Sequence, residues 1–187
     1  MKKKSLKEIE VKVKIGNVAE VKKTLEKLGV GWSKPKKQID SYFRLKNQAT
    51  ATQKPGSYIL RIRREDKASF TLKALTDRYG VWEEYETKID DADELEKILL
   101  KIGFVEVLTL HKKRTSGKYG KFSLEVDEIK ELGNYLEVEV RGQNGEKLQA
   151  EIKNLFLKVG LPEKNIERRG YPEIILGSRG LKFEGQS

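Results

Sequence analysis

Carboxylates and cations alternate with apolar residues at three places in the chain, and this spacing suits metal and phosphate chemistry. The first place is Glu8-Ile9-Glu10-Val11-Lys12, and the same spacing returns in Glu84-Tyr85-Glu86-Thr87-Lys88 and Glu137-Val138-Glu139-Val140-Arg141. A period of two is typical of a β-strand with one apolar face and one charged face. Each segment therefore places two carboxylates and a cation on one side of a strand. Hard divalent cations prefer such oxygen ligands.

Other predicted strands carry charged residues at alternate positions in the same way. Their charged sides hold Arg61, Arg63, Thr71, Lys73, Lys112, Arg114, Glu125 and Asp127. Arginine binds phosphate oxygens in a bidentate manner, so the basic residues could line a site for a triphosphate. The alternative for Glu84, Glu86, Glu125 and Asp127 is that they only neutralise neighbouring arginines.

The composition narrows the chemistry further. The 187 residues contain no cysteine and one histidine, His111. This excludes thiolate nucleophiles, cysteine-bound zinc and multi-histidine metal sites, and it disfavours a catalytic triad built on histidine. A metal ion would have to be held by carboxylates, which favours Mg²⁺ or Mn²⁺.

Length and hydropathy favour a single cytoplasmic domain. We expect this domain to span residues 1–177 and residues 178–187 to form a flexible tail. No apolar run approaches the roughly 20 residues that cross a bilayer, and the basic start lacks the apolar stretch of a signal peptide. The net charge of +10 permits nucleic-acid binding. However, lysine and glutamate enrichment is typical of thermophilic proteins, so we assign much of this charge to the surface.

The hydrophobic pattern predicts eight strands and three main helices. Strands are expected at residues 6–15, 38–46, 57–65, 68–75, 80–89, 104–115, 119–127 and 134–141. The strands at 104–115 and 119–127 should form a hairpin over Ser116-Gly117-Lys118. Helices are expected after the N-cap Asn17, at 91–102 and at 145–159. Runs of consecutive strands broken by helices indicate an α+β fold with a mainly antiparallel sheet.

An antiparallel sheet of eight strands tends to curl or close. The three helices need its apolar face, so we expect them outside and the charged face inside. Charged side chains in a barrel interior are costly unless they pair or hold a ligand. For any single strand the alternative stays open that the charged face simply meets water. The prediction is an eight-stranded antiparallel β-barrel, a tunnel with a charged interior.

With these motifs the sequence resembles the CYTH family, also called triphosphate tunnel metalloenzymes. The resemblance runs from Glu8 to about Leu176 and rests on the motifs at 8–12, 40–43, 60–63, 73, 112–114, 124–127 and 136–139 in the family's order. It implies an eight-stranded tunnel that binds a triphosphate through Lys12, Arg61, Arg63, Lys73, Lys112 and Arg114. One or two Mg²⁺ or Mn²⁺ ions would be held by Glu8, Glu10, Glu137 and Glu139, with help from Asp127. Some relatives use a further basic residue near the C-terminus, for which Arg179 and Lys182 are candidates.

The leading hypothesis is a metal-dependent triphosphatase that acts on a small-molecule triphosphate such as tripolyphosphate or ATP. Lys12, Glu8 and Glu10 are the predicted catalytic residues, and whether Lys12 or the metal ion activates the water stays open.

Two alternatives are kept. A class IV adenylyl cyclase would convert ATP to cyclic AMP and pyrophosphate, with an aromatic side chain stacking on the base; the candidates are Tyr42, Phe43, Tyr58 and Trp82. No residue pattern decides between hydrolysis and cyclisation. The lesser alternative is non-catalytic binding of polyphosphate or RNA, which an aromatic content of 8% disfavours. We therefore expect no nucleic-acid partner and no membrane partner, while monomer or dimer stays open.

Overall fold

The computed structural model describes residues 6–49 and 54–178. The chain divides into two compact units. Unit 1 comprises residues 1–36 and 112–168, and unit 2 comprises residues 37–111 and 169–187. The long strand β6 (Phe104–Tyr119) contributes its first half to unit 2 and its second half to unit 1.

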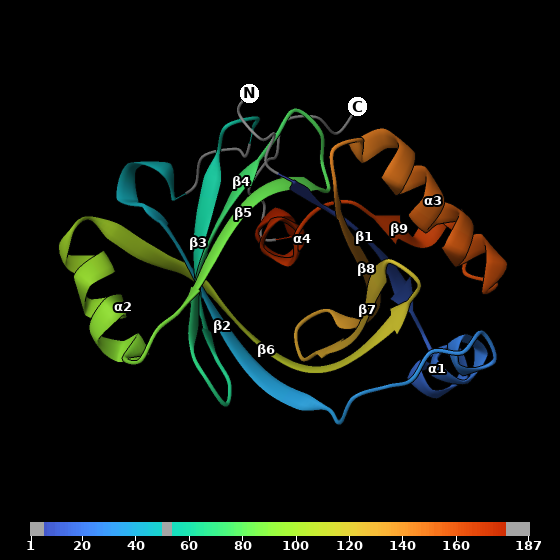
Figure 1. Cartoon of the computed structure of the whole chain (residues 1–187). Helices are drawn as coiled ribbons and strands as arrows, with labels where there is room; N and C mark the ends of the chain where they lie inside the picture. The colour runs from blue at the N-terminus through green and yellow to red at the C-terminus, as the bar shows by residue number, and fades with distance from the viewer. Residues whose placement is uncertain (1–5, 50–53, 179–187) are drawn as a thin grey trace. The chain divides into compact units, whose positions relative to one another are not determined.

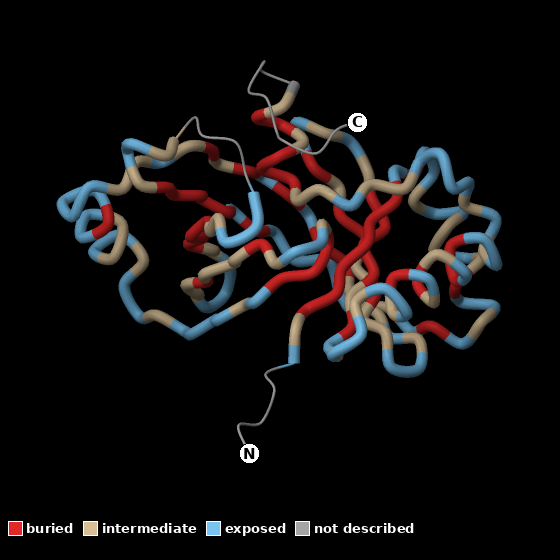
Figure 2. Tube along the Cα trace, turned by 90° about the horizontal axis from the view of Figure 1, so that it is seen from above, coloured by how far each residue is buried: buried red, intermediate tan, exposed pale blue. Residues whose placement is uncertain are grey.

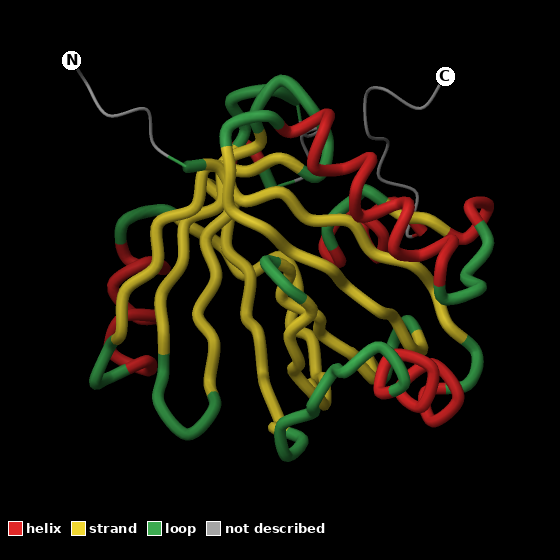
Figure 3. Tube along the Cα trace, turned by 45° about the vertical axis from the view of Figure 1, so that its right-hand side comes forward, coloured by secondary structure: helices red, strands yellow, loops and turns green. Residues whose placement is uncertain are grey.

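Unit 1 is built on antiparallel strands in the order β6-β7-β8-β1-β9 (Figure 1 and Figure 3). Besides β6 these are β1 (Lys7–Ile15), β7 (Phe122–Ile129), β8 (Gly133–Gly142) and the short β9 (Ile166–Glu167). Its helices are α1 (Val18–Glu26), α3 (Gly145–Lys158) and the 3₁₀ turn η2 (Glu163–Asn165).

Strand β1 shows why this unit holds a charged face. Ile9, Val11 and Val13 are fully or almost fully buried on one side, and α3 packs against β1 and β8. A glycine at position 142 leaves room for α3, because a Cβ atom there would lie 2.4 Å from Cδ1 of Leu148 and the tip of that side chain would have to shift. The helix therefore takes the apolar side of the strands, and the charged residues of β1 point to the opposite side.

An asparagine cap begins α3. The side-chain oxygen of Asn144 accepts a hydrogen bond from the amide of Lys147 at 3.0 Å. We expect Asn144→Ala to lower the free energy of unfolding by about 1 kcal/mol, because a first-turn amide loses its partner. Urea unfolding monitored by circular dichroism measures this loss. The matched control is Asn154→Ala, an exposed position within the same helix, where alanine should not destabilise. Equal losses in both variants would contradict a capping role.

Unit 2 contains strands in the order β5-β4-β3-β2-β6. They are β2 (Lys36–Leu45), β3 (Tyr58–Arg64), β4 (Ser69–Leu75), β5 (Val81–Lys88) and the first half of β6. The helices are α2 (Ala92–Lys101), α4 (Tyr171–Ser178) and the 3₁₀ turn η1 (Lys46–Gln48). Leu99 of α2 packs on Phe43, Leu60 and Ile62 to form the apolar core. Figure 2 shows the buried parts of the chain in red.

The predicted α+β class is confirmed, with eight antiparallel main strands β1 to β8 and helices in the predicted places. Among the described residues, β9 and α4 were not predicted. Helix α4 has Pro172 in its first turn, a position that tolerates proline. The division into one domain over residues 1–177 stays a prediction. Most of the predicted tail, with Arg179 and Lys182, lies outside the described residues.

The predicted hairpin turn over Ser116-Gly117-Lys118 is wrong. Strand β6 continues to Tyr119, which pairs with Phe122, so the turn is Gly120-Lys121. Gly120 has a φ of +56°, as two-residue hairpin turns require. Gly117 serves a different purpose, because a Cβ atom there would lie 2.7 Å from Cγ1 of Val30. It allows the segment before β2 to pass close to β6.

Candidate functional site

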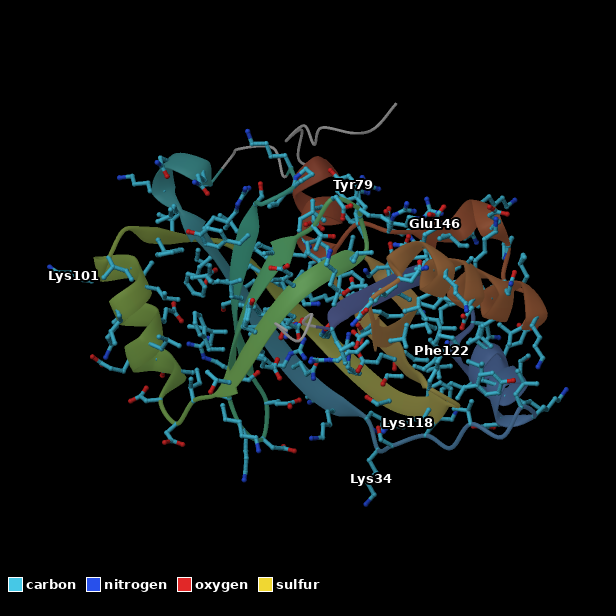
Figure 4. The ribbon with its side chains drawn as sticks, turned by 45° about the horizontal axis from the view of Figure 1, so that its top comes forward. Lys34, Tyr79, Lys101, Lys118, Phe122 and Glu146 are labelled. Atoms are coloured by element: carbon cyan, nitrogen blue, oxygen red, sulfur yellow. The ribbon has the colours of Figure 1, made fainter. Side chains whose placement is uncertain are left out.

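The charged face of unit 1 brings carboxylates directly opposite one another. Glu10 lies opposite Glu139 across β1 and β8, and Glu125 lies opposite Glu137 across β7 and β8. Like charges in such positions destabilise a sheet unless a cation lies between them. Figure 4 shows the side chains of these strands, with Lys118 and Phe122 near the turn that joins β6 and β7.

These carboxylates form two groups that share Glu139. One group is Glu8, Glu10 and Glu139, and the other is Glu125, Glu137 and Glu139. Within each group one oxygen per residue lies within 4.8 Å of the others. Opposite ligands of Mg²⁺, each at ~2.1 Å, are about 4.2 Å apart. An all-oxygen donor set with this spacing therefore suits a hard divalent cation, and it offers nothing that would select a soft metal.

Lys12 lies in the middle of the carboxylates and is fully buried. Its Nζ donates to Oε1 of Glu10 at 2.5 Å and lies 3.4 Å from Oε2 of Glu137. A buried ammonium group is tolerated only when carboxylates compensate for its lost hydration. The side chain is thus fixed beside members of both carboxylate groups.

Arg114 forms an ion-pair network with three carboxylates. Its Nε and Nη2 donate to the two oxygens of Asp127 at 2.6 and 2.5 Å. Nη2 also donates to Oε1 of Glu137 at 3.2 Å, and the guanidinium forms an ion pair with Glu125. Lys112 adds a second cation 3.5 Å from Asp127. Asp127 is therefore placed to orient cations, and it belongs to neither of the two carboxylate groups described above.

The buried charges in this face stabilise one another. Burial alone would lower the pKa of Arg114, but the nearby carboxylates, Asp127 first, raise it well above its usual value. Burial and the charge of Glu10 raise the pKa of Glu137, whereas Lys12 and Arg114 lower it, and the net direction is downward. Both groups are therefore charged at neutral pH, and the face presents fixed charges of both signs.

Unit 2 has a charged face of its own, where each cation is held by a carboxylate. Arg63 donates from Nε and Nη2 to the two oxygens of Asp40 at 2.7 and 2.8 Å. Arg61 donates from Nη2 to Thr71 at 2.9 Å and to Glu86 at 3.1 Å. Lys73 lies 3.0 Å from Glu84. Glu84 and Glu86 each contact a cation, so the neutralising role that the sequence left open for them agrees with these ion pairs.

Arg61 keeps hydrogen-bonding capacity for a ligand. Its Nε is buried and has no hydrogen-bond partner among the described residues. Burial lowers the pKa of Arg61, but Asp40, Glu84 and Glu86 raise it by more, so the guanidinium stays charged. Tyr42 lies directly opposite Arg61 on the same face, and burial followed by the charge of Asp40 raises the pKa of its phenol. The phenol therefore remains neutral.

The aromatic residues considered for base stacking have different environments. Phe43 belongs to the apolar core of unit 2, and Tyr58 packs against that core. Trp82 is buried, with Nζ of Lys73 6.0 Å from its ring centroid. Two of the four candidates, Phe43 and Tyr58, are therefore occupied with core packing.

The predicted site residues fall on two faces, one in each unit. The face of unit 1 carries Glu8, Glu10, Lys12, Lys112, Arg114, Asp127, Glu137 and Glu139. The face of unit 2 carries Arg61, Arg63 and Lys73. The sequence placed Glu125 together with Asp127 on the charged side of one strand, and Asp40 in the motif at 40–43, but named neither as a ligand of metal or phosphate. Nothing in the sequence pairs Asp40 with Arg63.

Comparison with known proteins gives matches that cover nearly the whole chain. The model of the CYTH domain family matches residues 6–171. A protein of Methanocaldococcus jannaschii, provisionally named an adenylate cyclase, is 33% identical over 180 residues, 93% of this chain and 99% of that protein. The solved structure of the PH1012 protein from Pyrococcus horikoshii OT3 has 26% identity and a TM-score of 0.78, over 89% of this chain and 98% of that one.

A more distant solved structure has the same fold. HpAC1 from Hippeastrum, provisionally named an adenylyl cyclase and described as having a dominant triphosphatase activity, is 18% identical with a TM-score of 0.61. The match covers 96% of this chain and 98% of that one. Within residues 6–49 and 54–178, no helix combines the length and apolar character needed to cross a membrane.

Proposed function

Since the chain belongs to the CYTH domain family, we propose that it is a metal-dependent triphosphatase acting within the tunnel typical of that family. The family includes triphosphatases and class IV adenylyl cyclases. The substrate would be inorganic triphosphate or an organic triphosphate, cleaved at a phosphoanhydride bond by water.

One observation carries this proposal: two carboxylate groups that share Glu139 lie next to Lys12 and Arg114 on one face. Phosphoryl transfer needs positioning and charge stabilisation more than it needs a covalent catalyst. The face offers oxygen ligands for divalent cations beside fixed donors for phosphate oxygens. This chemistry requires neither cysteine, which the chain lacks, nor a group of histidines, of which the chain has one.

The metal ligands in this proposal are Glu8, Glu10, Glu137 and Glu139, and the structure adds Glu125 as a fifth candidate. When bound, Mg²⁺ or Mn²⁺ neutralises phosphate oxygens and makes phosphorus more open to attack. One or two ions are compatible with the two groups. Asp127, which the resemblance placed near the metal, would instead orient Arg114 and Lys112.

The cations of the chain would bind and orient the phosphates. Arg114 presents a guanidinium held on three carboxylates, so little conformational entropy is lost when it binds an oxygen. Lys12 is fixed beside the carboxylates and would contact the phosphate nearest the metal ions. Lys112, Arg61, Arg63 and Lys73 would bind the remaining phosphate oxygens.

Arg61 and Arg64 offer a matched pair on one strand. We expect Arg61→Ala to raise KM for tripolyphosphate by about tenfold, with kcat changed by less than about threefold, because a charge-assisted hydrogen bond is lost. Arg64→Ala is the control, since Arg64 points to the other face and pairs with Asp93 and Glu96. Steady-state kinetics measures both. An unchanged KM in Arg61→Ala would remove Arg61 from the phosphate site.

Adenylyl cyclase is the second candidate, and the name of the Methanocaldococcus jannaschii relative supports it. The same metal ions and phosphate ligands would serve, with attack by the ribose 3′-hydroxyl in place of water. A cyclase must also bind a nucleoside, and Phe43 and Tyr58 are committed to the apolar core. The charged residues of the two faces would bind only the phosphates, and hydrolysis needs no nucleoside site. Hydrolysis is therefore the first proposal.

Product identification tests the proposal directly. The protein is incubated with Mg²⁺ or Mn²⁺ and either tripolyphosphate or ATP, and products are separated by ion-exchange chromatography. We expect orthophosphate and no cyclic nucleotide. Cyclic AMP with pyrophosphate from ATP would replace the triphosphatase by the cyclase, and absence of turnover with both substrates would refute both.

A further inference from the structure

The two-residue strand β9 places a carboxylate beside Lys12. It pairs antiparallel with β1 so that Glu167 lies directly opposite Lys12, and Figure 1 shows β9 beside β1. Residues in such positions point to the same face of a sheet, with Cβ atoms about 5 Å apart. Glu137 lies opposite Lys12 on the other side of β1. Lys12 therefore has a glutamate on each neighbouring strand.

The other carboxylates around Lys12 have a second task. Glu10 and Glu137 contact its Nζ, and each also belongs to a group that suits a divalent cation. A bound cation would share these oxygens and place a double positive charge next to the ammonium group. Lys12 is fully buried and cannot exchange the lost contacts for water. Glu167 belongs to neither group, so it would keep its charge for Lys12.

We propose that Glu167 is a positioning residue that holds the ammonium group of Lys12 in place while a divalent cation occupies the neighbouring carboxylates. This inference rests on the proposed function, which supplies the divalent cation and gives Lys12 a role in turnover. Its structural part concerns Glu167, Lys12 and the cation, and it can be tested without turnover.

The local geometry of Glu167 suits this role. Its Oε1 accepts a hydrogen bond from the backbone amide of Arg168 at 2.9 Å, which limits rotation of the carboxylate. The residue is half-buried at the edge of the charged face. Substitution by glutamine keeps the shape of the side chain and the strand pairing of β9 but removes the charge.

Nuclear magnetic resonance of the lysine ammonium groups tests the structural part without any turnover. Lys12 is assigned in ¹⁵N-lysine-labelled full-length protein by the signal that disappears in Lys12→Gln. In the unchanged protein we expect this signal to remain when Mg²⁺ is added. In Glu167→Gln we expect it to be present without Mg²⁺ and to broaden or vanish with it. A signal that persists in Glu167→Gln at saturating Mg²⁺, or that vanishes in the unchanged protein, overturns the proposal.

Metal binding separates positioning from ligation. The affinity for Mn²⁺, measured by electron paramagnetic resonance without substrate, should change by less than about threefold in Glu167→Gln, because Glu167 would act on Lys12 alone, whereas a residue that holds or orients the metal ligands typically contributes about 10- to 100-fold. A larger loss would make Glu167 a metal ligand and refute the positioning role. Absence of Mn²⁺ binding in the unchanged protein would instead refute the proposed function.

Kinetics supplies a second, independent measurement. Glu167→Gln should lower kcat for tripolyphosphate by about tenfold with KM changed less than about twofold, which is typical of coupling between neighbouring residues. In a Lys12→Gln background the same substitution should have no further effect. The control is Glu163→Gln, since Glu163 is exposed and pairs with Lys153. Additive losses in the double variant would show that Glu167 acts independently of Lys12 and would overturn the proposal.

Discussion

Replacement of Glu139 by glutamine is expected to reduce metal-dependent turnover more than any other single carboxylate substitution. Glu139 is the only residue that belongs to both carboxylate groups found among the described residues. If the two groups hold two ions, loss of this carboxylate weakens both. Outer-shell partners of metal ligands typically contribute 10- to 100-fold, so removal of a shared ligand should lower kcat by more than about 100-fold.

The fold should survive this substitution. Glu139 lies opposite Glu10, so glutamine relieves a repulsion between like charges when no cation is bound. We expect the thermal midpoint without metal to stay the same or rise, while the affinity for Mn²⁺ falls by more than about tenfold. Opposite effects on stability and on metal binding are a signature that general unfolding cannot produce. Calorimetry and Mn²⁺ titration by electron paramagnetic resonance measure the two quantities.

Glu128→Gln is the matched control on a neighbouring strand. Glu128 lies on β7 and forms a partly exposed ion pair with Lys113. Such pairs contribute little, and neither kcat nor Mn²⁺ affinity should change. Glu137→Gln removes a member of one group only. Its kcat and its affinity for Mn²⁺ should lie between those of the control and those of Glu139→Gln. Full activity of Glu139→Gln would end the assignment of the metal centre to this face.

The fold could be predicted from the sequence because its strands obey a strict alternation. Ile9, Val11 and Val13 on one side and Glu10 and Lys12 on the other define the strand, its apolar face and its charged face without further information. The cap of α1 was equally clear, since Asn17 accepts from the amide of Glu20 as its spacing predicted.

The missed elements lack such periodic signals. Strand β9 has only two residues, and its pairing with Lys12 depends on tertiary contacts. The end of β6 was predicted in the wrong place, because Gly117 was interpreted as part of a turn. A glycine can serve either a turn or the close approach of two chain segments. Gly117 serves the close approach and Gly120 serves the turn, and one sequence cannot distinguish these two uses.

The partners within the site could be predicted only in part. The alternation shows which residues share the charged side of one strand, but register decides which residues face each other across strands. The register places Glu10 opposite Glu139 and Glu125 opposite Glu137, which turns a general charged face into two candidate cation sites. Register also explains the contact of Asp40 with the charged face of unit 2, because it places Asp40 opposite Arg63.

These ion pairs imply how a substrate would bind. In each unit the arginines and lysines proposed for phosphate binding already contact carboxylates. A bound phosphate would therefore join an existing network of ion pairs and would not meet isolated cations. Divalent cations offset the extra negative charge that a triphosphate brings. We therefore expect substrate and metal to bind cooperatively. Arg114 is the cation whose removal should change the net charge of the carboxylate groups most clearly.

Removal of the Arg114 guanidinium is the change expected to destabilise unit 1 most. Arg114 contacts Asp127, Glu137 and Glu125, and Asp127 is fully buried. Breaking a buried pair by removing one partner typically costs about 3–5 kcal/mol, because the other charge stays buried without compensation. We expect Arg114→Ala to lower the free energy of unfolding by an amount in this range, reduced somewhat by the remaining contact of Lys112 with Asp127.

Divalent cations should partly reverse this loss. Without Arg114 the group of Glu125, Glu137 and Glu139 gains net negative charge, so a cation binds it more tightly and stabilises the folded state. Saturating Mn²⁺ should therefore raise the thermal midpoint of Arg114→Ala by more than it raises that of the unchanged protein. The control is Lys113→Ala, which removes an exposed ion pair from the other side of the strand and should cost less than about 1 kcal/mol. An Arg114→Ala variant that is as stable as the control, or that gains no extra protection from Mn²⁺, would show that the guanidinium and the cation do not compensate the same carboxylates.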